Sequence, residues 1–123
     1  MFTETLFESA YMGGITAAAS LQISGNSKVQ FDGTVGAGSS HEASAAVKVA
    51  EMKAFLIVSD QATVAVTTDQ AETLMGSGKK KATWNHQSGE SNPVSTDFAS
   101  ITINNTGSED AVVKFIFIVD DAA

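Results

Sequence analysis

The sequence contains no cysteine and no arginine, and it has only two histidines, one proline, one tryptophan and one tyrosine among 123 residues. Without cysteine, the chain cannot form disulfides, thiolate zinc sites, iron–sulfur clusters or a cysteine nucleophile. Without arginine, it lacks the planar cation that binds a phosphate through two hydrogen bonds at once. Because the net charge is also −7, we expect nucleic acid not to be a partner.

Long apolar runs and a basic start are missing as well. No stretch approaches the roughly 20 apolar residues needed to cross a bilayer, so no membrane partner is expected. Glu4 and Glu8 precede the first cation, Lys28, which contradicts the basic start of a secretory signal. The length fits one domain. These features predict a single-domain protein that is made in the cytoplasm.

The residues that are present form short strand patterns separated by Gly, Ser, Asn and Asp. Residues 54–58 are a continuous apolar run, as in a strand buried on both faces, and residues 63–67 alternate between apolar and polar. Ser59, Asp60 and Gln61 lie between them as a turn, so the pattern over residues 52–69 predicts a hairpin. Other predicted strands cover residues 15–24, 27–35, 43–49, 72–75, 82–86, 98–104 and 112–119.

About eight strands at this spacing predict an all-β fold, a two-layer antiparallel β-sandwich of jelly-roll type. Residues 15–123 would form the sandwich, and residues 1–14 would form an N-terminal arm. Residues 104–110, with Asn-Thr-Gly, are expected to be the turn of the last hairpin. The aromatic residues expected to fill the core are Phe31, Phe55, Trp84, Phe98, Phe115 and Phe117.

The N-terminal segment breaks the strand pattern. Its apolar residues are Phe2, Leu6, Phe7, Tyr11 and Met12, and they precede a double glycine. The spacing fits a short amphipathic helix and an extended arm equally well. Such a segment covers its own domain in one interpretation and docks on a neighbouring subunit in the other.

The sequence shows no constellation with catalytic spacing. His41 and His86 could form a metal or acid–base pair only if the fold brought them together, and surface positions are the simpler interpretation. The acidic residues occur at predicted turns, outside any calcium-loop or nucleophile motif. We therefore expect no enzyme activity, no cofactor and no metal site.

One cationic cluster, Lys79, Lys80 and Lys81, lies beside a glycine turn. A solvated turn that discourages aggregation of strand edges is one interpretation. The other is a salt-sensitive contact with an acidic surface on a larger partner.

Several features occur in an order that resembles small β-sandwich proteins of tailed bacteriophages. They are residues 52–69, Trp84, the Asn92–Pro93 loop and the strand pair ending near Val119, and they span about residues 47–119. The resemblance implies a capsid decoration, or cement, protein that binds the outside of an assembled head and stabilises it. The implied partners are the major capsid protein and further copies of the chain, with a trimer favoured on symmetry grounds, and the implied location is the virion surface.

On this hypothesis, subunit or capsid contacts come from the N-terminal apolar residues, the lysine cluster and the loop with Asn92 and Pro93. Two alternatives remain. One is a glycan-binding module of a head fibre or tail, which would need stacking aromatics beyond Trp84 and Tyr11. The other is an enzyme on a cupin-like jelly roll, for which two histidines are too few.

Overall fold

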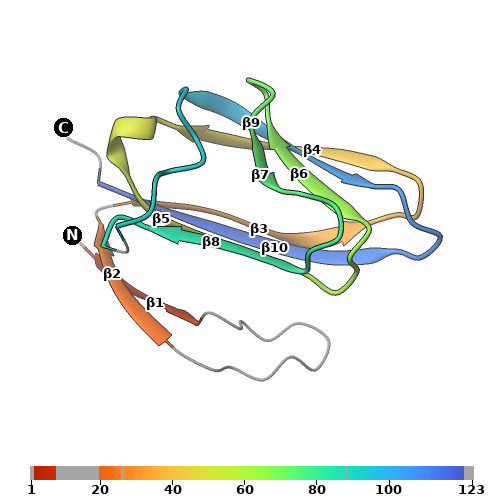
Figure 1. Ribbon diagram of the computed structural model, residues 1–123, viewed down its shortest axis with the longest axis horizontal. Coiled ribbons are helices and arrows are strands. Elements are labelled where there is room, and N and C mark those ends of the chain that lie inside the picture. Colours follow the sequence, from red (N-terminus) through yellow and green to blue (C-terminus); the bar gives the residue numbers. More distant parts are fainter. Residues whose placement is uncertain (1, 8–19, 26, 88, 121–123) are drawn as a thin grey trace.

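The structure is a computed structural model that describes residues 2–7, 20–25, 27–87 and 89–120. Two four-stranded antiparallel sheets face each other, and a two-stranded sheet lies outside them (Figure 1). The first sheet has the order β3-β10-β5-β8 and the second the order β4-β9-β6-β7. The strands are β1 (Phe2–Phe7), β2 (Ser20–Gly25), β3 (Ser27–Val35), β4 (Ser40–Val47), β5 (Met52–Ser59), β6 (Val64–Thr68), β7 (Thr73–Met75), β8 (Lys81–Asn85), β9 (Phe98–Asn105) and β10 (Ala111–Val119).

The strand pairing confirms the predicted jelly-roll sandwich. β3 pairs with β10, β4 with β9, β5 with β8, and β6 with β7, all antiparallel. The first strand of the sandwich therefore pairs with the last, the second with the last but one, and so on inward, which is a long hairpin rolled up into two sheets. The two layers are seen edge-on in Figure 1, with β3, β10, β5 and β8 in the lower layer.

The predicted hairpin over residues 52–69 is wrong, because β5 and β6 lie in different sheets. β5 is hydrogen-bonded to β10 on one side and to β8 on the other, so neither of its edges is left for β6. The polar residues 59–63 instead carry the chain across from one sheet to the other. The predicted last hairpin is wrong for the same reason, since β9 and β10 also belong to opposite sheets.

The burial expected for these segments is confirmed. From Ala54 to Ser59 every residue of β5 is buried, as expected of a central strand covered on both faces, and β6 alternates between buried and half-buried residues. The core between the sheets contains a chain of phenylalanine contacts. Phe117 lies 5.4 Å from Phe55, 5.6 Å from Phe98 and 5.6 Å from Phe115 between ring centroids. Phe31 and Trp84, also predicted for the core, are only half-buried because they lie on edge strands.

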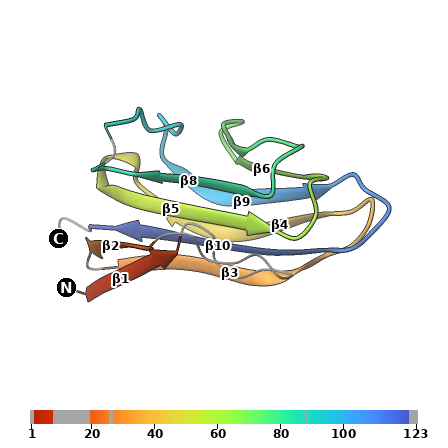
Figure 2. The same cartoon turned by 60° about the horizontal axis from the view of Figure 1, so that its bottom comes forward.

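The N-terminal segment is a strand where the structure describes it. β1 pairs with β2 over six residue pairs, from Phe2–Gly25 to Phe7–Ser20, so this part is neither a helix nor a lone arm. β2 runs near β5 and β10, and both views place β1 and β2 on the side of the first sheet that faces away from the second (Figures 1 and 2). The described residues contain no helix long enough to span a bilayer.

Asn105 is the buried polar residue that joins three loops at one end of the sandwich. Its side chain is fully buried, and its amide donates hydrogen bonds to the carbonyl oxygens of Val35 (3.2 Å) and Glu109 (2.7 Å). Its side-chain oxygen accepts hydrogen bonds from the Thr63 hydroxyl (2.8 Å) and the Gly107 amide (3.0 Å). The amide group thus satisfies four polar groups from loops that are far apart in sequence.

We predict that Asn105→Ala lowers the free energy of unfolding by about 2–4 kcal/mol, because it leaves several buried polar groups without partners. Asn104→Ala is the matched control: Asn104 is exposed and accepts one side-chain hydrogen bond, from the Ser40 hydroxyl. The control should cost less than about 1 kcal/mol. Urea denaturation of both variants measures the difference, and equal losses would contradict the role assigned to Asn105.

Candidate interaction surfaces

The fold does not bring the two histidines together. His41 lies on β4 near the end of the sandwich that holds Asn105, and its ring is 5.2 Å from that of Phe31. His86 follows β8 at the opposite end, where its amide donates to the carbonyl oxygen of Lys53. Across the described part of the chain, no group of three His, Asp or Glu side chains could hold a metal ion.

The acidic side chains near the loops accept hydrogen bonds from backbone amides. Glu72 accepts from Ser95 and Thr96, and Asp69 accepts from Ala99. A carboxylate that receives amide hydrogen bonds from a distant segment fixes the path of the loop. The same arrangement joins Asp60 to Val112 (2.8 Å), Asp97 to Val49 (2.9 Å) and Asp110 to Ala37 (3.0 Å).

The hydrogen bonds to Glu72 lower the pKa of its carboxyl group. The Ser95 hydroxyl donates to its carboxylate at 2.7 Å, and the amides of Ser95 and Thr96 add further hydrogen bonds. These bonds, with the Ser95 hydroxyl contributing most, hold the pKa of Glu72 below its ordinary value, against a smaller opposing effect of burial. In its ionised form, Glu72 therefore anchors the segment that contains Ser95 and Thr96.

The predicted lysine cluster lies at the connection between β7 and β8. Lys79, Lys80 and Lys81 are all exposed, and the turn is fixed by Gly78, whose φ is +98° and whose amide donates to Ala62. The carbonyl oxygen of Lys80 accepts a hydrogen bond from the Ser59 amide. The cations thus project from a turn that is held by its backbone.

Asn92 and Pro93 lie at the other end of the sandwich. Asn92 is half-buried, and its side chain bonds the Val94 amide (2.9 Å) and the Met52 sulfur (3.6 Å), so it supports its own loop. Pro93 is exposed beside it. β5 runs from Met52 to Ser59, so roughly 20 Å separate this loop from the lysine turn. A partner that touches both must span the length of the sandwich.

The side chain of Trp84 also stabilises the fold. Trp84 is half-buried on β8, and its indole N–H donates to the carbonyl oxygen of Glu90 at 2.9 Å. Its ring packs against the core from the edge of the sheet. This use of the indole weighs against Trp84 as a freely presented sugar-stacking ring.

The N-terminal candidates are only partly placed. Phe2, Leu6 and Phe7 lie on β1. Tyr11 and Met12 lie outside the described residues.

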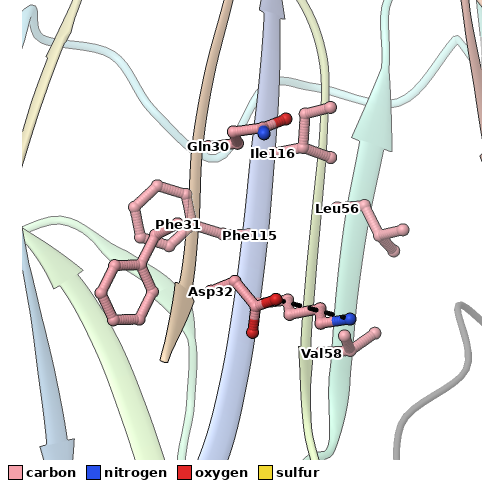
Figure 3. Close-up of a pocket in the computed structure, with 8 residues that line it drawn as sticks. Gln30, Phe31, Asp32, Leu56, Val58, Phe115 and Ile116 are labelled. Atoms are coloured by element: carbon pink, nitrogen blue, oxygen red, sulfur yellow. Dashed lines mark ion pairs between the residues drawn. The ribbon is translucent and has the colours of Figure 1, made fainter. Parts of the chain in front are cut away.

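The outer face of the first sheet carries a hollow that the sequence did not predict. It has a volume of about 300 Å³ and includes the apolar side chains of Leu56, Val58 and Ile116 (Figure 3). An ion pair between Lys114 and Asp32, 3.7 Å apart and exposed, crosses one side of it. The signal in the sequence was the unbroken apolar run of β5, which places Leu56 and Val58 opposite the core-facing Phe55 and Ile57.

No protein-family model matches this chain, and a search of curated proteins finds no similar one.

We predict that Glu72→Gln destabilises the protein at pH 7, and that the difference from the natural protein disappears in acid. The pKa of Glu72 is lowered in the folded state, so its contribution is present above the unfolded value, about 4.5, and is lost as the pH falls through the lower folded value.

The measurement is urea denaturation of both proteins between pH 7 and pH 3. Glu42→Gln, at an exposed position of β4, is the control for removing one charge and should change stability little at either pH. A Glu72→Gln deficit that persists unchanged at low pH would exclude the charged hydrogen bonds as its cause.

Proposed function

We propose that the chain is a capsid decoration protein, which binds the exterior of a tailed-phage head and stabilises it as a symmetric oligomer. The resemblance over residues 47–119 leads to this proposal. The observation that supports it best is the use of loop polar groups: at both ends of the sandwich, side chains such as Asn105, Glu72 and Asn92 bond the protein's own backbone. A rigid body with fixed loops suits binding at many equivalent lattice positions.

The lysine turn is the proposed capsid contact. Its three cations are exposed in a chain whose net charge is −7, and Lys79 and Lys80 lie in the turn itself, where an acidic patch on the capsid could reach them. Each such contact is weak and screened by salt. Many copies on a fixed lattice, or several subunits in one oligomer, raise retention without new contacts.

The direct test mixes the purified chain with undecorated tailed-phage capsids, assembled from the major capsid protein of the same phage, and images them by electron microscopy. Density at regular lattice positions is expected. Capsids that remain bare at saturating concentration and low salt would refute the proposal.

We predict that reversing two of the cations, in the Lys79→Glu/Lys80→Glu variant, weakens capsid binding about tenfold or more at low salt and flattens its salt dependence. Lys48→Glu/Lys53→Glu makes the same change of charge at the other end of the sandwich and serves as the matched control. Co-sedimentation with capsids over a salt series measures both. Equal weakening by the two variants would show that net charge, rather than the lysine turn, controls binding.

A further inference from the structure

The strand β3 is a long edge strand of the first sheet. It spans nine residues, Ser27–Val35, and among the described strands its only neighbour in the order β3-β10-β5-β8 is β10. The residues Lys28, Gln30, Asp32 and Thr34 are exposed. A long edge strand with accessible backbone groups is a template for a further strand.

The backbone groups that face outward on β3 follow from those of β10. Val112 exchanges hydrogen bonds with Asp60, next to β5: its oxygen accepts from the Asp60 amide, and its amide donates to the Asp60 carboxylate. Since neighbouring residues of a strand point their amide and carbonyl groups to opposite sides, Phe115 points its groups toward β3. Phe115 is paired with Phe31, so Phe31 bonds to β10. The adjacent residues Gln30 and Asp32 therefore direct their N–H and C=O groups to the free edge.

The charges along this edge are self-complementary. We propose that β3 pairs antiparallel with β3 of a second copy of the chain, about a two-fold axis at Gln30, and joins two four-stranded sheets into one. In this register Lys28 lies opposite Asp32 of the second copy, and the same pair recurs across the axis. Opposite charges on directly facing residues stabilise a strand pair.

The inner face of the edge agrees with the same register. Val29 lies opposite Phe31 of the second copy, and both side chains are half-buried in the single chain. Phe31 is already held in place, because its ring stacks on that of Phe115, with 5.4 Å between the centroids. The ring also lies directly over Gly33: a side chain at that position would bring its Cβ within 2.8 Å of the ring. Pairing would cover the parts of Val29 and Phe31 that water now reaches, at little cost in conformational freedom.

Other pairings match less well. A shift of two residues places Gln30 opposite Asp32 and Lys28 opposite Thr34, which separates the charges. The other edge strands of the two four-stranded sheets are β8 with five residues, β7 with three, and β4 with eight. β4 carries exposed Glu42, and a two-fold axis at that residue would set two carboxylates against each other. Between the two long edges, the charge pattern therefore favours β3 in this register.

The first test compares proline substitutions on the two edges in the full chain. Gln30→Pro removes an N–H that points to the free edge, so the sandwich tolerates it while the contact between copies is blocked. Glu42→Pro on β4 is the matched control. Light scattering over a dilution series should show twice the chain mass for the natural protein and for Glu42→Pro, and a single-chain mass for Gln30→Pro. A natural protein that stays monomeric at high concentration, or that forms the trimer favoured above on symmetry grounds, would overturn the proposal.

The second test fixes the register and does not depend on tolerance of proline. Asp32→Lys places like charges in contact across the axis and should weaken dimerisation about tenfold or more. Lys28→Asp/Asp32→Lys exchanges the charges and should restore dimerisation, although the pair between Asp32 and Lys114 remains absent. Failure of the exchange to restore the dimer would contradict this register.

The contact does not rest on capsid binding. A dimer of this kind that leaves capsids bare would retain the contact and refute the proposed function. A monomer that decorates capsids would refute the contact between copies and support the proposed function.

Discussion

Both ends of the sandwich depend on side-chain oxygens that accept hydrogen bonds from the backbone of distant segments. A jelly roll passes the chain repeatedly between two sheets, and each crossing leaves amides outside the regular ladders. Asp60 and Asp110 accept such hydrogen bonds at one end, and Glu72 and Asp97 accept them at the other. Without these acceptors, the ends of the core strands would meet water-exposed, unfixed loops.

This requirement gives the acidic composition a structural explanation. Carboxylates are strong acceptors for amide hydrogen bonds, and in this chain several of them are placed where a loop passes a strand from elsewhere in the sequence. Part of the negative charge near the loops thus belongs to carboxylates that fix the loops by accepting backbone hydrogen bonds. The lysine turn stands apart from this pattern because its geometry is fixed by Gly78 and by backbone hydrogen bonds, which leaves the cations exposed.

The fold class could be predicted from the sequence because alternation and apolar runs report burial directly. The apolar run of β5 indicated a central strand, and the alternation of β6 indicated a strand with one buried face. Strand partners could not be predicted in the same way. A short polar link such as residues 59–63 fits a hairpin and a crossing between sheets equally well, and the competition of β8 and β10 for the edges of β5 decides between them.

The candidate surfaces were predictable only where the signal was local. Three adjacent lysines beside a glycine identify an exposed turn, and the structure places them on one. By contrast, the outer hollow combines residues from three strands, and it could not be predicted without knowing that Lys114 faces Asp32. The edge position of β3 likewise depends on the order of strands in the sheet, which the sequence does not show. The internal role of Asn92 was missed because the sequence does not show that Met52 lies beside it.

The edge contact and the lysine turn lie on opposite borders of the first sheet, and this separation has a consequence for binding. In the proposed dimer the order β8-β5-β10-β3 continues into β3-β10-β5-β8 of the second copy, so the two β8 strands form the outer borders of one sheet. Seven strand spacings, on the order of 30 Å, then separate the two lysine turns across the sheet. The turns are also offset along the strands, because the two-fold axis at Gln30 reverses the strand direction of the second copy. Each turn alone offers a weak, salt-screened contact. On the proposed function, two turns on one rigid sheet would offer the capsid a bivalent contact, whose strength would depend on whether acidic patches on the lattice repeat at a matching distance. Specificity for an assembled shell over free capsid subunits would then follow from spacing, because only the assembled lattice fixes two patches at once.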